Sequence, residues 1–211
     1  MKEINGVMAA TRDPDRTRER IVAAATAEFS ERGPAGARVD AIAQRAGVNK
    51  RMLYHYFGGK DDLFTEILRR TIEKRSARYE EAPEGLGDFL AHTYVRAAAE
   101  DTDWMRLITW EALALESGEP IRQEERRRDA IASYVRRWQL RQGDGGVPED
   151  LDPVYLQLMI TALTTYPQVF RQIVRLTTGR SPEDPDFQAG WADFLRQLGR
   201  RLQALAAAQP S

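Results

Sequence analysis

The residues best suited to chemistry lie in one short stretch, "GVNKRMLYHYFGGKDDLF", which spans residues 47–64. It places two cationic side chains, Lys50 and Arg51, a few residues before two phenols, Tyr54 and Tyr56. Guanidinium and ammonium groups bind phosphates and the edges of guanine, and phenol hydroxyls donate hydrogen bonds to phosphate oxygens. The chemistry that this stretch indicates is non-covalent binding of nucleic acid.

Residues that could support catalysis are sparse. The two histidines, His55 and His92, lie in different parts of the chain, and there is no cysteine, which excludes a Cys/His nucleophile and a paired-histidine zinc helix. Adjacent acids such as Asp61 and Asp62 diverge on a helix, unlike carboxylates that flank a substrate. The glycine-rich stretch 143–153 lacks the Lys-Ser/Thr of a phosphate-binding loop. The sequence therefore predicts no catalytic residue, no metal site and no cofactor.

Composition describes an ordinary soluble globular protein. Of 211 residues, 42% are hydrophobic and 30% are charged. No apolar run approaches the roughly 20 residues that cross a bilayer, and the N-terminus shows no secretory signal, so we expect a cytoplasmic protein without a membrane partner. The net charge of -1 divides into +4 over residues 1–60 and -5 over residues 61–211. This asymmetry favours an anionic partner for the N-terminal part.

The elements that must position these residues are all helical, because apolar residues recur with a helical period and no alternating strand pattern appears. The first helix begins at Asp13-Pro14 and ends at Gly33-Pro34. Gly58-Gly59 separates the third helix from a long fourth one that begins at Lys60. The other predicted helices span about 39–46, 50–57, 84–100, 103–117, 120–142, 152–178 with a break or kink at Pro167, and 185–208.

The second and third helices are joined by the tight turn "AGVNK", which is typical of a helix-turn-helix. About 100° per residue places Leu53 and Phe57 on one side of the third helix, which is expected to pack inward. The outward and flanking positions are Arg51, Met52, Tyr54, His55 and Tyr56. Plain packing of the two tyrosines, and a solvated charge at Lys60, remain as alternatives.

Residues 16–68 resemble the DNA-binding domain of the TetR family of bacterial transcriptional regulators. The resemblance is carried by "RERIVAAATAEFSERG", "VDAIAQRAGV" and "LYHYFGGKDDLF", in the family's order and spacing. It implies a homodimeric all-helical repressor whose C-terminal helices bind a small effector. It also implies that Tyr54 and Lys60 contact phosphate. The complete set of expected DNA-binding residues is Arg38, Asn49, Lys50, Arg51, Met52, Tyr54, His55, Tyr56 and Lys60.

Two positions depart from the family pattern. Arg38 stands where a threonine often caps the second helix, and a guanidinium cannot accept a hydrogen bond from the helix N-terminus. Asp40 could offset this through the helix dipole, which would leave Arg38 to reach a phosphate. Gly59 replaces a common Ser or Asn cap before Lys60, and glycine makes the approach to that lysine looser.

The C-terminal part contains a candidate dimer surface. Residues 154–163 are apolar nearly all round, and the last helix carries one broad apolar stripe. Pairing both helices with their symmetry mates would form a four-helix interface, which is also where the TetR family dimerises. The alternative is that both helices fill the core of one chain. The predicted interface residues are Leu156, Met159, Ile160, Leu163, Trp191, Phe194, Leu195, Leu198 and Leu202.

Residues 84–142 are rich in aromatics, which commonly line pockets for apolar ligands. Glu111 lies among these apolar positions, where a charge is unfavourable unless it is paired. It could orient a ligand, or it could pair with an arginine such as Arg96 or Arg128. The predicted effector pocket consists of His92, Trp104, Leu107, Ile108, Trp110, Glu111, Tyr134 and Trp138.

The sequence thus predicts an all-α protein with an N-terminal arm at residues 1–13, a helix-turn-helix domain at 14–62 and a helical effector-binding and dimerisation domain at 63–208. The expected function is that of a non-enzymatic repressor that binds a palindromic operator as a homodimer and is released by a small, largely apolar effector. Two alternatives remain open. One is a DNA-binding protein of the same fold with an architectural or protein-partner role, and the other is an enzyme or carrier on the same scaffold.

Overall fold

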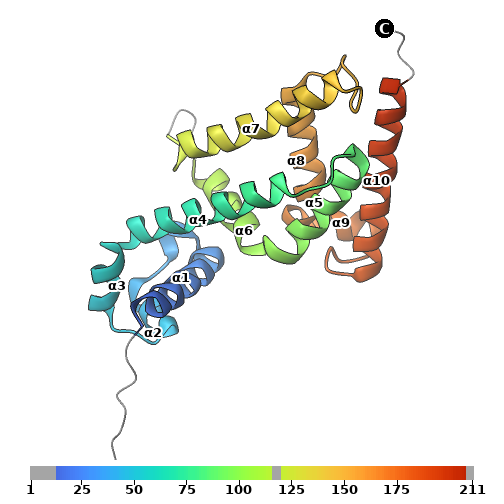
Figure 1. Cartoon of the computed structure of the whole chain (residues 1–211). Coiled ribbons are helices and arrows are strands. Elements are labelled where there is room, and N and C mark those ends of the chain that lie inside the picture. Colours follow the sequence, from blue (N-terminus) through green and yellow to red (C-terminus); the bar gives the residue numbers. More distant parts are fainter. Residues whose placement is uncertain (1–12, 116–119, 208–211) are drawn as a thin grey trace, which may run out of the picture. The chain divides into compact units, whose positions relative to one another are not determined.

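The computed structural model describes residues 13–115 and 120–207, in which every regular element is an α-helix (Figure 1). The all-α prediction is confirmed. The predicted arm, apart from Asp13, lies outside the described residues. The helices are α1 (Pro14–Gly36), α2 (Val39–Ala46), α3 (Lys50–Phe57), α4 (Lys60–Glu80), α5 (Leu86–Glu100), α6 (Thr102–Ala114), α7 (Glu124–Gly143), α8 (Pro153–Val169), α9 (Arg171–Thr178) and α10 (Pro185–Ala207). None of these helices is long and apolar enough to cross a membrane.

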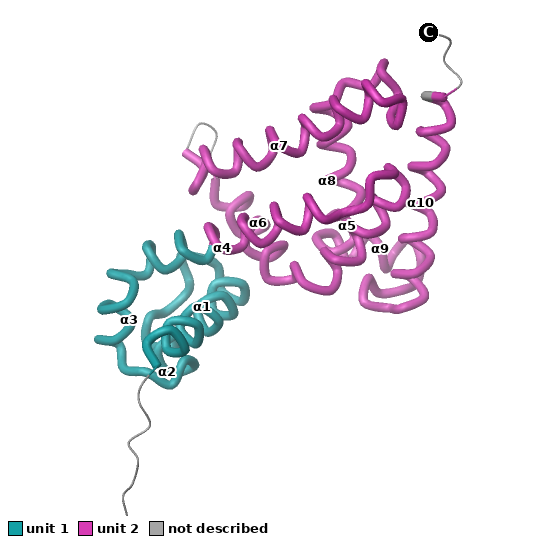
Figure 2. The backbone as a smooth tube through the Cα atoms, viewed as in Figure 1, with its two compact units in different colours: residues 1–67 teal, residues 68–211 magenta. Residues whose placement is uncertain are grey.

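The chain forms two compact units, residues 1–67 and residues 68–211 (Figure 2). The division lies inside α4, whereas the sequence places the boundary between residues 62 and 63. The first turns of α4 pack in unit 1, and its remaining turns pack in unit 2.

Unit 1 is built from α1, α2, α3 and the start of α4. Asp13 caps α1 by accepting hydrogen bonds from the backbone N–H groups of Asp15 and Arg16 at 3.0 and 3.3 Å. At Gly33 the backbone leaves helical geometry (φ 70°, ψ 166°), so the break predicted there is present, although one more turn follows it. The core includes Phe29 and Phe64, whose rings meet edge to face at 4.9 Å.

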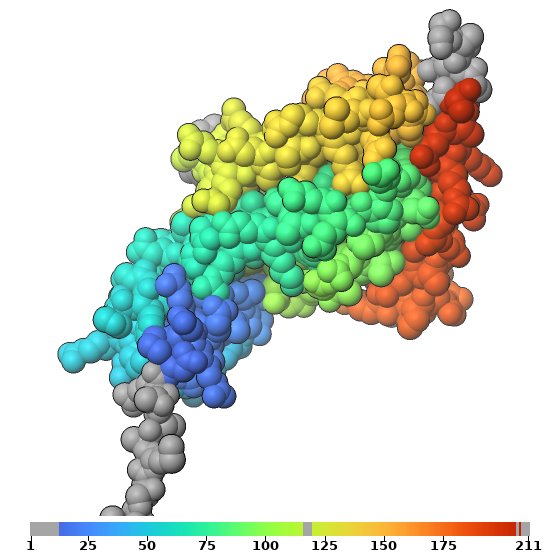
Figure 3. All heavy atoms as spheres, viewed as in Figure 1, coloured from blue at the N-terminus to red at the C-terminus, as the bar shows by residue number. Residues whose placement is uncertain are grey.

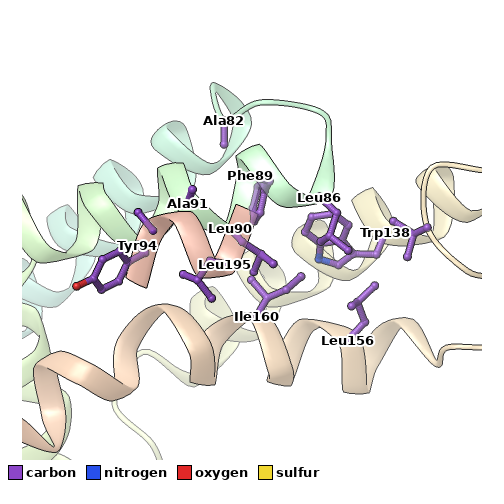
Figure 4. Packing of buried hydrophobic residues seen from close by; sticks show 12 residues of the cluster. Ala82, Leu86, Phe89, Leu90, Ala91, Tyr94, Trp138, Leu156, Ile160 and Leu195 are labelled. Carbon is purple, nitrogen blue, oxygen red and sulfur yellow. The ribbon is translucent and has the colours of Figure 1, made fainter. Parts of the chain in front are cut away.

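Unit 2 is organised around α5, which packs against both α10 and α8. Its core contains Trp138 of α7, whose ring stands perpendicular to that of Phe89 at a centroid distance of 4.8 Å (Figure 4). Leu156 and Ile160 approach this cluster from α8. In the space-filling view α7 forms a continuous yellow band along unit 2, and α10 forms a red edge (Figure 3).

The contact between α5 and α10 is unusually close because two glycines face each other. A Cβ atom added at Gly87 would lie 2.4 Å from the carbonyl oxygen of Arg196, and one at Gly199 would lie 2.4 Å from the Cα of Gly87. Since real Cβ atoms do not approach so closely, the two helices touch backbone to backbone here. This crossing fixes α10 to the core of unit 2.

Several predicted helices differ in extent from the observed ones. Helix α6 ends at Ala114, and residues 116 and 117 of its predicted end lie outside the described residues. Helix α7 begins at Glu124 because Gln123 adopts a left-handed conformation (φ 57°). The predicted break near Pro167 occurs at Phe170, where α8 ends and α9 begins.

The C-terminal end of α4 is held by a side chain from α7. The Arg137 guanidinium donates hydrogen bonds to the carbonyl oxygens of Tyr79, Ala82 and Pro83 at 2.9, 2.8 and 2.9 Å. Carbonyls at a helix end lack partners within the helix, and a cation there also suits the helix dipole. The same guanidinium lies 5.0 Å from the ring centroid of Phe89.

Candidate nucleic-acid interface and ligand cavity

The turn between α2 and α3 has the geometry of a helix-turn-helix. Gly47 ends α2 in the left-handed region (φ 65°, ψ 38°), and the N–H of Val48 donates to the carbonyl of Ala43 at 3.0 Å. Asn49 then caps α3 by accepting a hydrogen bond from the N–H of Met52 at 2.9 Å. Both local signals read from the sequence are therefore present.

Helix α3 divides into a packed side and an exposed side, as its period predicts. Leu53 and Phe57 are buried in the core of unit 1. Tyr54 is 45% exposed, and Tyr56 is half-buried against the ring of His55 at 5.4 Å. The predicted DNA-binding residues Asn49, Lys50, Arg51, Tyr54 and His55 are exposed, whereas Met52 and Tyr56 are partly buried.

Lys60 is positioned by the end of α1. Its Nζ donates to the carbonyl oxygens of Ala35 at 3.4 Å and Ala37 at 3.3 Å. These two contacts hold the ammonium group of Lys60, the first residue of α4, against the chain at the end of α1. The looser approach expected from Gly59 is thus offset by a specific tether.

The start of α2 is stabilised by a residue that sequence reasoning missed. Arg38 at the cap position makes no side-chain capping bond, as expected. Instead the carboxylate of Glu28, only 2% exposed, accepts a hydrogen bond from the Arg38 backbone N–H at 3.3 Å and pairs with Arg32 at 3.4 Å. The Arg38 side chain is exposed. Asp40, expected to act through the dipole, also pairs with Lys50 at 3.1 Å.

Unit 2 contains a cavity of about 340 Å³ between α4, α5, α6, α7 and α8. Four of the eight predicted pocket residues line it: His92, Trp104, Ile108 and Tyr134. The other four do not. Leu107 and Trp138 are fully buried, since their side of each helix packs into the core, and Trp110 lines a separate depression outside α6.

Glu111, the fourth of these, makes an ion pair within the chain. Its carboxylate accepts hydrogen bonds from both terminal nitrogens of Arg127, at 2.5 and 3.2 Å. The partners considered from the sequence are engaged elsewhere, Arg96 with Glu100 at 2.9 Å and Arg128 with Glu124 at 2.6 Å. The sequence alternative of internal pairing is therefore confirmed, with a different arginine.

The cavity wall also carries arginines that the sequence did not single out. Arg75 and Arg78 of α4 both bind the carboxylate of Asp101, which is 5% exposed. Trp104 lies beneath two guanidinium groups, those of Arg75 at 5.5 Å and Arg127 at 5.4 Å from its ring centroid. Burial lowers the pKa of Arg75, with the charge of Asp101 acting in the opposite direction. Arg75 and Arg78 stand three residues apart on α4, and this spacing, which places them on the same face of the helix, is the only sequence signal that could have grouped them.

A hydrogen-bonded network closes the other side of the cavity. The Oε1 of Gln157 accepts from the Tyr79 hydroxyl at 2.6 Å and from the Trp138 indole N–H at 2.8 Å. Tyr79 stacks on Tyr134 at 3.7 Å, and the Tyr134 hydroxyl lies 3.1 Å from that of Ser76. Burial raises the pKa of Tyr79, so its hydroxyl stays neutral.

The predicted dimer surface is partly internal. Leu156, Ile160 and Leu195 are buried in the core of a single chain, so a partner cannot contact them. Met159, Leu163, Trp191, Leu198 and Leu202 are half-buried and Phe194 is exposed. Exposed apolar residues that the prediction omitted are Tyr155 (71% exposed), Leu158 (60%), Tyr166 and Phe170. An all-round apolar helix does not reveal which side faces solvent.

Comparisons with known proteins agree with this architecture. Residues 21–67 match the model of bacterial regulatory proteins of the tetR family, and residues 86–201 match the tetracyclin repressor-like C-terminal domain. The chain is 28% identical over 193 residues to the HTH-type transcriptional repressor SCO4008 of Streptomyces coelicolor, covering 92% of this chain and 98% of that protein.

Two further similarities also cover most of the chain. The chain is 31% identical over 174 residues to the HTH-type transcriptional regulator RutR of Escherichia coli, covering 79% of this chain and 81% of RutR. The solved structure of SCO4942 from Streptomyces coelicolor superposes with a TM-score of 0.67 at 28% identity, over 86% of this chain and 97% of that one. The chain therefore belongs to the TetR family of DNA-binding bacterial transcriptional regulators.

Proposed function

We propose that this protein is a transcriptional repressor that binds a palindromic operator as a homodimer and is released by a small effector bound in the cavity of unit 2. The DNA-binding part of this proposal rests on the two sides of α3. Its buried residues, Leu53 and Phe57, fix the helix, while its other side exposes cationic and phenolic groups. The similarity to a protein described as a repressor supports the direction of regulation.

The exposed side of α3 combines two kinds of contact. Asn49, Lys50, Arg51 and Met52 occupy the N-terminal end, which in a helix-turn-helix enters the major groove and reads base edges. Tyr54 and Tyr56, with Arg38 and Lys60 on neighbouring elements, supply phosphate contacts. His55 is exposed on the same helix and has a short reach. The tether of Lys60 to the end of α1 favours phosphate binding, because the ammonium group is already positioned.

Dimerisation is proposed to occur through α8 and α10. A helix-turn-helix protein that binds one half-site gains affinity when it dimerises, because the symmetry-related subunit places a second α3 in the next half-site, about one helical turn of DNA away. Helices α8 and α10 expose aromatic and aliphatic side chains next to the half-buried Leu163 and Trp191, and extended apolar surface of this kind marks an interaction site. The proposed interface residues are Tyr155, Leu158, Met159, Leu163, Tyr166, Trp191, Phe194, Leu198 and Leu202.

The cavity supports a role for a small-molecule effector. Its volume of about 340 Å³ lies in the range of ligand sites, and its walls combine apolar residues with a few convergent polar groups. An effector that favours one geometry of the dimer would shift the population away from the geometry that matches the operator. Ile72, Trp104, Ile108 and Ile131 in the cavity wall favour an effector that is largely apolar.

The proposal is tested by selecting bound fragments from the source genome and measuring affinity for the recovered site. We expect tight binding to a palindrome, at least about 1,000-fold tighter than to scrambled DNA of equal length, with a steep salt dependence. Sedimentation should show a dimer on the operator. Equal affinity for both DNAs would contradict sequence-specific regulation. Specific binding that no small molecule reverses would instead favour an architectural or protein-partner role.

A further inference from the structure

Given the proposed effector role of the cavity, we propose that its ligand is an amphipathic organic anion, with a carboxylate at the arginine side and an aromatic or branched aliphatic body against the apolar wall. This goes beyond a largely apolar effector, because it assigns a charge to the ligand and a place in the cavity for that charge.

The charges in the wall favour an anion. Four arginines line the cavity, Arg75, Arg78, Arg96 and Arg127, and Asp101 is the one acid among the described lining residues. The other carboxylates that pair with these arginines, Glu100 and Glu111, do not line it. Four guanidinium groups against the three carboxylates of Asp101, Glu100 and Glu111 leave an excess of positive charge beside the cavity, which favours an anion.

Unused hydrogen-bond donors favour an anion as well. The terminal nitrogens of Arg78 donate hydrogen bonds to Asp101 and Glu100, and both terminal nitrogens of Arg127 donate to Glu111. In the described part of the chain no group accepts a hydrogen bond from the buried Nε of Arg78 or of Arg127. A buried donor without an acceptor is unfavourable, and because neither Nε faces the open cavity, a ligand oxygen relieves it only when the guanidinium group turns toward the ligand. A carboxylate suits this arrangement, because it accepts in several directions and forms charge-assisted bonds.

Burial of the guanidinium groups adds a third reason for an anion. The side chains of Arg78 and Arg127 are 11% and 17% exposed, and burial lowers the pKa of Arg75. A partly desolvated cation is stabilised by further negative charge nearby. A neutral apolar ligand would instead remove water from these groups and offer nothing in return.

The remaining wall sets the body of the ligand. Ile72, Ile108, Ile131 and Leu158 supply apolar surface, and the Trp104 ring lies against the guanidinium groups of Arg75 and Arg127. A volume of about 340 Å³ is at the low end for ligand sites. A single aromatic ring or a short branched chain therefore fits better than a polycyclic body.

The test compares 4-phenylbutyrate with its neutral amide, 4-phenylbutanamide, and with the cationic amine 4-phenylbutylamine. Binding to the full-length protein is measured by calorimetry and by tryptophan fluorescence, since Trp104 lies in the wall. We expect the acid to bind at least about tenfold more tightly than the amide, and the amine to bind most weakly. A branched acid, 4-methylpentanoate, is measured beside its own amide to separate the charge from the ring.

Matched variants locate the effect. Arg127→Gln should weaken binding of the acid about tenfold and leave binding of the amide unchanged. Arg128→Gln removes the same charge from the next position, which pairs with Glu124 outside the cavity, and should change neither. Because Arg127→Gln leaves Glu111 unpaired, Glu111→Gln is the second variant. It releases the terminal nitrogens of Arg127 and should tighten binding of the acid.

Equal binding of acid and amide, preference for the amine, or the same loss in both arginine variants would overturn the assignment. So would failure of both acids to bind to a protein that still recognises its operator. Acid-selective binding by a protein without sequence-specific DNA binding would retain the ligand class and reject the proposed repressor. The two proposals can therefore fail separately.

Discussion

The indole N–H of Trp191 donates a hydrogen bond to the carbonyl oxygen of Leu163 at 3.2 Å. Leu163 lies four residues before Pro167, and proline has no N–H to complete the helical bond to that carbonyl. A side chain of α10 thus satisfies the acceptor that a proline in α8 leaves open. The contact ties together the two helices proposed to form the dimer surface.

Trp191→Phe should lower the free energy of unfolding by about 1–3 kcal/mol, because it leaves the Leu163 carbonyl without its partner. Pro167→Ala supplies a backbone N–H at position 167, so Trp191→Phe should be less destabilising in that background. Urea unfolding of the four proteins in a double-mutant cycle measures the coupling. Equal effects of Trp191→Phe in both backgrounds would show that the proline is not the reason for the bond.

Gly199→Ala should destabilise unit 2 by about 1–3 kcal/mol, because the new methyl group would meet the backbone of Gly87. Gly190→Ala on the same helix is the control. No atom lies within 4 Å of a Cβ placed there, so alanine should stabilise by about 0.5–1 kcal/mol through its better helix propensity. Thermal unfolding of both variants decides the matter, and matching shifts would argue against the close crossing.

Tyr94→Phe should be neutral or raise the free energy of unfolding by about 1 kcal/mol. The buried Tyr94 hydroxyl, labelled in Figure 4, has no hydrogen-bond partner among the residues described, so its removal relieves an unfavourable group. Denaturant titration at neutral pH tests this expectation, and a clear loss of stability would contradict it.

The same variant should change the response to alkali. Burial, and secondarily the charge of Glu183, raises the pKa of Tyr94 to about 12, above the ordinary tyrosine value of about 10. Above pH 10 the unfolded chain loses this proton more readily than the folded one, so stability is retained below about pH 10 and falls as the pH rises toward 12. Tyr94→Phe should flatten this fall. An unchanged slope would mean that Tyr94 titrates normally.

Arg51→Ala should relax base preference, with a loss of about 1–3 kcal/mol on the operator and little change on random DNA. Lys60→Ala should weaken binding to all sequences alike and reduce the salt slope by about one. Lys74→Ala, a charge removed from α4 in unit 2 where Lys74 pairs with Glu100, should leave both unchanged. Fluorescence anisotropy at several salt concentrations separates these effects. Identical losses on operator and random DNA for Arg51→Ala would reject its role in base reading.

Local signals in the sequence were sufficient for unit 1. The caps at Asp13 and Asn49 and the turn at Gly47 act over a few residues, and the period of α3 separates Leu53 from the exposed positions. The stabilising carboxylate of Glu28 could not be foreseen from the sequence. It lies ten residues before Arg38, whose backbone N–H donates the hydrogen bond, and its position is that of an ordinary surface acid of α1.

Unit 2 was less predictable because its helices are packed on more than one side. Tyr134 and Trp138 stand one turn apart on α7, yet one lines the cavity and the other fills the core. Leu156 and Leu158 are both leucines of α8, yet Leu156 is buried and Leu158 is exposed. Arg75 and Arg78 look like solvated charges until Asp101 is brought to them from the end of α5. Which neighbour a helix face meets is a property of the tertiary structure.

The three hydrogen bonds from Arg137 also have a consequence for local opening. Helix ends normally fray, and their amides exchange with solvent without unfolding of the rest. Opening of the last turn of α4 and the residues after it breaks the bonds from a guanidinium anchored on α7, more than fifty residues later in the chain, to Tyr79 in the helix and to Ala82 and Pro83 beyond it. The amides of this turn should therefore share the slow hydrogen exchange of α7, so that two distant segments behave as one cooperative unit.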